Sequence, residues 1–148
     1  MSRPKHTTDT QTHESALREY FHRVRPAGVA SAYLYGSAAR GQAHAESDVD
    51  VGVLLDRACF PSREQRSGER VRLTAELIHV LKNNDVDLVI LNDVPPGLGR
   101  HAVTEGMRVY VADPEADHAF CRDVQLRAAD LDPFLRRMRR IKLRTLSS

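Results

Sequence analysis

The stretch YGSAARGQAHAESDVDVGVLL, residues 35–55, is the most informative part of this sequence. Within it Gly36 and Ser37 are followed by ten residues and then by an Asp-x-Asp pair, Asp48 and Asp50. Side chains two positions apart in a strand leave the same face, so the two carboxylates point together. Adjacent carboxylates repel each other unless a cation lies between them, and ligation by oxygen alone suits Mg²⁺. The stretch therefore predicts a divalent-cation site at the start of a strand.

A third carboxylate can join this pair. The run VDLVIL, residues 86–91, is apolar except for Asp87, whose neighbours take the opposite face of the expected strand. If this strand lies beside the strand of residues 48–55, Asp87 joins the same acidic cluster. Three carboxylates on two strands can hold two Mg²⁺ ions, which clamp the attacking and leaving oxygens in phosphoryl transfer. Asp85 is a competitor for the third position, but it precedes the apolar run and fits a turn better.

The residues that follow the first expected strand suit a phosphate. A glycine such as Gly36, directly after a strand, lets the backbone approach a ligand closely. Ser37 would open a short helical turn whose free N–H groups and hydroxyl can hold a phosphate. Arg40 lies about one turn later, where its guanidinium can neutralise the same triphosphate. The plain alternatives are that Ser37 only caps a helix and that Arg40 is a solvated surface residue.

Length and composition describe one globular domain. A chain of 148 residues can remove roughly 70% of its surface from water, and a 41% hydrophobic share excludes wholesale disorder. No apolar run approaches the ~18 residues that cross a bilayer, and no signal peptide is recognisable. Cys59 and Cys121 do not suggest a disulfide scaffold. We expect a cytoplasmic protein with a flexible arm over residues 1–12 and a single domain over residues 13–148.

The spacing of apolar residues predicts an α+β fold, in which a small mixed sheet carries helices mostly on one side. Proline and glycine mark most of the boundaries between elements. The expected strands cover residues 29–35, 48–55, 86–91 and 107–112. The expected helices begin near Thr12, near residue 62, at Pro95-Pro96 and at Pro114, with a last one after Pro133.

The charge is mild in sum but unevenly spread. The 22 basic and 20 acidic residues give a net charge of +2, which does not indicate a nucleic-acid binder. The absence of tryptophan also argues against a base-stacking platform for single strands. Residues 136–144 are rich in arginine and lysine and contain no acid; they fit a partner surface, a solvated face or an RNA contact, and we favour the partner. The seven histidines show no spacing typical of a zinc site and are interpreted as solvated.

The Gly-Ser-x10-Asp-x-Asp pattern resembles the signature of the nucleotidyltransferase superfamily related to DNA polymerase beta. The stretch of residues 35–55 is similar to the minimal nucleotidyltransferases, the small stand-alone members of that superfamily. The similarity continues through VDLVILNDVPPGLGRHAVTEGMRVY and covers roughly residues 29–112. Members of this group resemble antitoxins that pair with HEPN-domain ribonuclease toxins. The resemblance implies a hetero-oligomer with such a toxin and transfer of AMP from ATP to its tyrosine hydroxyls, which neutralises it.

The resemblance also implies a role for each motif residue. Asp48, Asp50 and Asp87 would be catalytic metal ligands for two Mg²⁺ ions, and Asp87 would assist deprotonation of the incoming hydroxyl. The nucleotide would be held by Gly36, Ser37 and Arg40.

Two other functions remain open on the sequence. The chain could be a non-catalytic antitoxin that blocks the toxin by binding alone. It could also transfer a nucleotide to a small molecule, such as an aminoglycoside, or to an RNA end. The chain is short for an additional substrate domain, which argues against the antibiotic.

Overall fold

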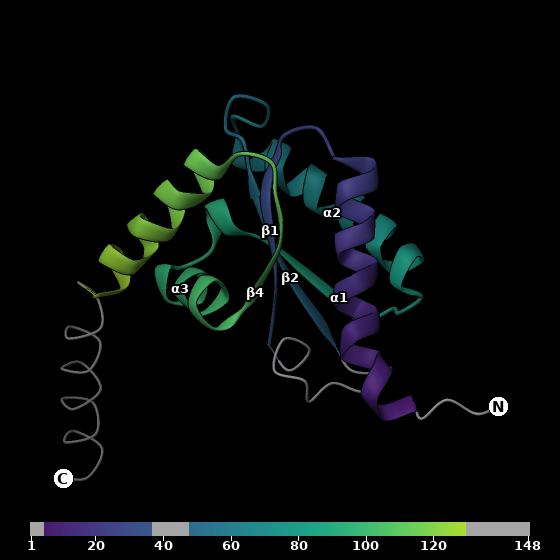
Figure 1. The fold of residues 1–148 in the computed structure, drawn as a ribbon. Coiled ribbons are helices and arrows are strands. Elements are labelled where there is room, and N and C mark those ends of the chain that lie inside the picture. The colour runs from purple at the N-terminus through teal and green to yellow at the C-terminus, as the bar shows by residue number, and fades with distance from the viewer. Residues whose placement is uncertain (1–4, 37–47, 130–148) are drawn as a thin grey trace, which may run out of the picture.

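The apolar runs of the sequence form the strands of one sheet, and the amphipathic segments form the helices around it (Figure 1). The computed structural model describes residues 5–36 and 48–129, with side chains from residue 13 onward. The strands are β1 (Val29–Tyr35), β2 (Val49–Leu55), β3 (Val86–Ile90) and β4 (Met107–Val111). The helices are α1 (Lys5–Val24), α2 (Arg63–Leu81), α3 (Pro96–Glu105) and a helix over residues 114–129, with a short 3-10 helix at Leu91–Asp93.

The sheet is mixed, as the sequence predicts. Its strand order is β3-β2-β1-β4, and β1 pairs antiparallel with both β2 and β4. The pair formed by β2 and β3 is parallel. Parallel neighbours need a crossover connection, and α2 supplies it. The expected strands and the α+β class are therefore confirmed.

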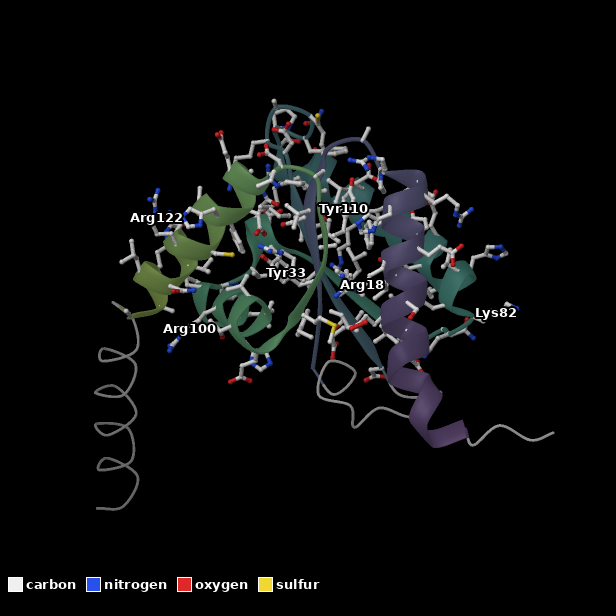
Figure 2. All side chains as sticks on the ribbon, viewed as in Figure 1. Arg18, Tyr33, Lys82, Arg100, Tyr110 and Arg122 are labelled. Atoms are coloured by element: carbon white, nitrogen blue, oxygen red, sulfur yellow. The ribbon has the colours of Figure 1, made fainter. Side chains whose placement is uncertain are left out.

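The helices cover both faces of the sheet, so the expectation that they lie mostly on one side is wrong. On one face, α1 and α2 bury Phe21 and Leu77 against the sheet. The other face carries α3 and the helix of residues 114–129 (Figure 1), and Figure 2 labels Tyr33 on this side. Here Ala102 and Phe120 pack in one cluster with Tyr33. The physical reason is that all seven residues of β1 are buried, and a strand that is apolar on both sides needs a layer on each.

The first helix begins at Lys5, well before the expected start near Thr12. Residues 5–12 of the expected flexible arm are therefore helical. No proline or glycine stands between residues 5 and 24, so nothing in the backbone stops the helix from extending toward the N-terminus. The helix ends where Arg25 and Gly28 adopt positive φ angles.

The next three helices begin near the expected residues. Ser62 caps α2 through a capping box with Gln65, and Gly106 follows α3 directly. The expected helical turn after Ser37 and the expected helix after Pro133 lie outside the described residues. None of the helices within the described ranges is both long and apolar enough to cross a bilayer.

A buried carboxylate fastens the helix of residues 114–129 to the sheet. Asp117 is 1% exposed, and it accepts a hydrogen bond from the Tyr33 hydroxyl at 2.5 Å. Its other oxygen accepts from the Arg108 guanidinium at 3.0 Å. Burial, together with the hydrogen bond to Asp117, raises the pKa of Tyr33. The Tyr33 hydroxyl therefore keeps its proton and donates it to Asp117. Through Tyr33 and Arg108, the Asp117 carboxylate joins the helix of residues 114–129 to β1 and β4.

We predict that Asp117→Ala lowers the free energy of unfolding by about 2 kcal/mol, because Tyr33 and Arg108 both lose their partner. Urea denaturation followed by circular dichroism measures this. Asp123→Ala is the matched control on the same helix. Asp123 pairs with Arg127 at the surface, so its loss is expected to change stability by less than about 0.5 kcal/mol. Equal effects of the two substitutions would contradict the fastening role.

Candidate active site

Strand pairing sets two of the three expected acidic residues side by side. In the parallel pair of β2 and β3, Asp50 is the register partner of Asp87. The expectation that these two strands are neighbours is thus confirmed. Leu88 and Ile90 face the α1–α2 core, so Asp87 leaves the opposite face, which is also the face of Asp50. Asp48 lies two residues before Asp50, directly before β2 begins, and is exposed.

The strand β1, which pairs antiparallel with β2, lies beside these carboxylates. We call the end of the sheet that carries Asp48, Asp50 and Asp87 the acidic corner. Tyr35, the last residue of β1, is the register partner of Asp50 and is 6% exposed. Burial raises the pKa of Tyr35 to about 12, with further contributions from the negative charges of Asp50 and Asp87. The phenol therefore keeps its proton at neutral pH.

Mutual repulsion is visible in the electrostatics of Asp50. Burial raises the pKa of Asp50, the charges of Asp87 and Asp48 raise it further, and His101 lowers it. The charges of Asp48 and Asp87 thus both act on Asp50 at one end of the sheet. A cation bound among them would relieve that repulsion.

Gly36 brings the backbone against these carboxylates. It has a positive φ of 75°, which favours glycine. A Cβ atom at this position would lie 2.3 Å from Oδ2 of Asp50, closer than real contacts allow. The glycine of the motif is therefore required by geometry at the acidic cluster. Ser37 and Arg40 lie outside the described residues, so their roles stay predictions.

His101 was not singled out by the sequence, yet it lies at the same place. Its ring meets the ring of Tyr35 edge-on, with centroids 6.1 Å apart. Its Nδ1 lies 3.2 Å from Oε2 of Glu105, one turn further along α3. The only signal in the sequence is this spacing of four residues, which is common on any helix surface.

The donor chemistry of the corner fits Mg²⁺. Asp48, Asp50 and Asp87 offer only carboxylate oxygens, which hard divalent cations prefer. Within residues 5–36 and 48–129, however, no three acidic, histidine or cysteine side chains are already gathered closely enough to hold a metal ion. Asp48 and Asp87 are exposed, so their carboxylates can turn toward Asp50 without unpacking the core.

A separate cavity of about 450 Å³ lies at the other end of β2, lined in part by Leu55, Phe120 and Arg127. It contains none of the three carboxylates. The three carboxylates that the sequence predicts as metal ligands therefore lie outside this cavity.

We predict that Gly36→Ala destabilises the protein by about 1–2 kcal/mol, because the new methyl group meets Asp50 in a left-handed backbone conformation. Gly68→Ala is the control, since a Cβ at Gly68 meets nothing within 4 Å in α2. That change is expected to stabilise by about 0.5–1 kcal/mol, as alanine suits a helix interior better than glycine. Urea unfolding of both variants measures the difference. A neutral effect at Gly36 would contradict the close approach.

We predict that Asp50→Asn raises the melting temperature by about 2 °C at neutral pH. The pKa of Asp50 is raised in the folded protein, so its ionised form costs folding free energy above that pKa. The gain should shrink as the pH falls below the raised pKa of the folded state and vanish below the ordinary aspartate pKa, because Asp50 is then neutral in the folded and the unfolded protein alike. Added Mg²⁺ should stabilise the parent and not the variant. Differential scanning calorimetry at several pH values, with and without Mg²⁺, measures this; a gain that is independent of pH would contradict it.

Solved structures with a similar fold come from toxin–antitoxin complexes. A toxin–antitoxin crystal structure with AMP-PNP matches with a TM-score of 0.60 and 24% identity, over 84% of this chain and 97% of that chain. A MNT antitoxin in complex with a tri-AMPylated HEPN toxin of Shewanella oneidensis matches with a TM-score of 0.56 and 22% identity, over 87% and 98% of the two chains. A third match is a mutant MntA complex in which two aspartates, two positions apart, are replaced by glutamate; its TM-score is 0.60 at 22% identity, over 84% and 97%. At these identities the likeness shows the fold.

No curated protein matches this chain in sequence. Residues 16–115, however, match the family model described as polymerase beta, nucleotidyltransferase. The matched range contains the C-terminal part of α1, all four strands, and the paired carboxylates of β2 and β3. The chain therefore belongs to the polymerase beta nucleotidyltransferase family.

Proposed function

We propose that this protein is a cytoplasmic antitoxin that transfers AMP from ATP to a tyrosine hydroxyl of a HEPN-domain ribonuclease toxin and thereby neutralises it. The observation that carries the proposal is the register pairing of Asp50 with Asp87, with Gly36 packed against the first of them. This is the arrangement that nucleotidyl transfer needs, because carboxylates and a close backbone meet where a triphosphate would bind.

Two of the similar structures support the finer assignment. One toxin–antitoxin complex contains AMP-PNP, an analogue of ATP, and another contains a HEPN toxin that carries three AMP groups. The match covers 97% and 98% of the two chains in those complexes, so the likeness extends over nearly their whole length. We therefore propose ATP as substrate and a HEPN-domain protein as partner.

The chain's own residues have distinct tasks in this proposal. Asp48, Asp50 and Asp87 hold Mg²⁺, which supplies positive charge opposite the triphosphate when bound. Asp87 also assists deprotonation of the incoming hydroxyl. The backbone at Gly36 allows the phosphates to come close, and they are held by Ser37 and Arg40.

The reaction itself is a displacement at phosphorus. The tyrosine oxygen of the acceptor forms a bond to the α-phosphorus of ATP, and the bond from that phosphorus to the bridging oxygen breaks. Pyrophosphate leaves, and the hydroxyl loses its proton. Catalysis then depends on positioning and on charge, because the enzyme contributes no covalent intermediate.

We predict that Asp48→Asn and Asp50→Asn each lower AMP transfer by about 100-fold or more, since each removes a charged oxygen from the cation site. Intact-mass spectrometry of a co-expressed HEPN partner counts the added AMP groups. Asp85→Asn is the control, because Asp85 is exposed in the turn before β3 and its charge is not in the pair. Near-normal transfer by Asp48→Asn or Asp50→Asn would refute the metal role.

The double variant Asp48→Asn/Asp50→Asn separates the catalytic antitoxin from one that acts by binding alone. If it no longer protects cells from the HEPN toxin, neutralisation depends on transfer, as proposed. If it protects fully, the protein blocks its partner by occupying it. Transfer to a small molecule or an RNA end, and none to protein, would indicate the third possibility.

A further inference from the structure

A small hollow lies across the edge of the sheet that β3 forms. Among the described strands, β3 pairs only with β2, so its other edge is open. The hollow has a volume of about 160 Å³ and is lined there by Val89 and Ile90, whose side chains leave opposite faces of the strand. The remaining lining comes from the N-terminal half of α2 and from the segment after β3, and it consists of Arg63, Ser67, Arg70, Asp93 and Val94. The carboxylates of the acidic corner do not line this hollow.

The helix α2 lines the hollow with three polar side chains. Arg63, Ser67 and Arg70 follow one another at intervals of four and three residues, so they lie on one face of the helix. All three residues are exposed. A ligand that enters from solvent therefore meets two guanidinium groups and one hydroxyl, all of which can donate hydrogen bonds.

The acidic residue of the hollow is already paired. Asp93 is the only carboxylate among the described residues that line it. The two carboxylate oxygens of Asp93 accept hydrogen bonds, each at 2.9 Å, from Nε and Nη2 of Arg66, a buried residue of α2. This bidentate pair balances its own charge. Because no carboxylate of the described ranges pairs with Arg63 or Arg70, the hollow keeps two uncompensated positive charges.

The backbone of β3 holds the Arg70 side chain in place. Nε of Arg70 donates a hydrogen bond to the Leu88 carbonyl oxygen at 2.8 Å. This bond fixes the guanidinium at the edge of the strand and leaves the N–H groups of its two terminal nitrogens without a partner among the described residues. A donor group that is already oriented loses less conformational entropy when it binds a ligand. Arg70 is therefore prepared to bind an anion.

We propose that this hollow is a phosphate-binding site, in which Arg63, Ser67 and Arg70 hold one phosphate group at the edge of β3. Guanidinium groups match the oxygens of a phosphate in geometry and keep their charge over the physiological pH range. A hollow of about 160 Å³ holds one such group rather than a nucleotide, since pockets for whole ligands of that kind have about 300–1,000 Å³. The ligand is inorganic phosphate or the phosphate of a small ester. The site is independent of AMP transfer, because it contains none of the residues assigned to that reaction.

Nuclear magnetic resonance of the nitrogen-15-labelled full chain tests this site, with inorganic phosphate as the probe. The titration is done without Mg²⁺ and at constant ionic strength, which sodium chloride maintains. We expect the backbone amide signals of Ser67, Val89 and Val94 and the Nε–H signal of Arg70 to shift together and to saturate in the millimolar range. Glycerol phosphate, titrated in the same way, distinguishes the two sources. Matching shifts indicate that the site accepts an ester, and shifts with inorganic phosphate alone indicate that it binds the free ion.

Two substitutions on α2 separate the hollow from the charge of the whole protein. Arg63→Gln should weaken phosphate binding by about fivefold or more, because it removes an exposed, unpaired charge that lines the hollow. Arg72→Gln is the matched control on the same helix. Arg72 pairs with Glu69 and Glu76 outside the hollow, so its loss should change the affinity by less than about twofold. Arg70→Lys keeps the charge but loses the planar donor group, and it should also weaken binding. Circular dichroism checks that each variant is folded.

Other outcomes would overturn the assignment. Shifts that do not saturate, or that sodium chloride alone reproduces, would mean that phosphate only screens the surface charge. Shifts confined to the acidic corner would place the anion there instead. Equal weakening by Arg63→Gln and Arg72→Gln would show that net charge, and not this hollow, attracts phosphate. Binding of an RNA strand without binding of either small phosphate would assign the arginines to a nucleic-acid contact.

Discussion

The repulsion between Asp50 and Asp87 is the constraint on which the rest of the structure depends. Backbone hydrogen bonds of a parallel strand pair fix the two residues as register partners, so their backbones cannot separate without breaking the sheet. Burial and the neighbouring charges raise the pKa of Asp50, so the ionised carboxylate is less stable in the folded protein than in water. A fold retains such a pair when function requires it, and a bound cation converts the repulsion into binding energy.

The remainder of the fold holds this corner rigid. Both faces of β1 are covered by helices, so the strand that carries Tyr35 and leads into Gly36 is immobilised along its whole length. Asp117 fastens the helix of residues 114–129 to β1 and β4 through Tyr33 and Arg108. Groups on packed strands are positioned more closely than groups on loops, as charge-based catalysis demands.

The sequence predicts those features that depend on the two-residue alternation of side chains along a strand. Alternation within β2 and β3 predicts the shared face of Asp50 and Asp87, and the pairing of the two strands confirms it. Which faces of the sheet carry helices is harder to predict, because the apolar run of β1 is compatible with helices on one face or on both. His101 lies on α3, far from Tyr35 in sequence, and the edge-on contact of the two rings follows from the packing of α3 on β1, which no period in the sequence indicates.

Tyr35 indicates what an incoming tyrosine would experience. It is a phenol beside the same carboxylates, and burial together with their charges raises its pKa to about 12. A substrate hydroxyl in this field would likewise hold its proton tightly, so negative charge alone opposes the reaction that the site is proposed to perform. Positive charge at the carboxylates removes that opposition, and this is what the proposed Mg²⁺ would supply.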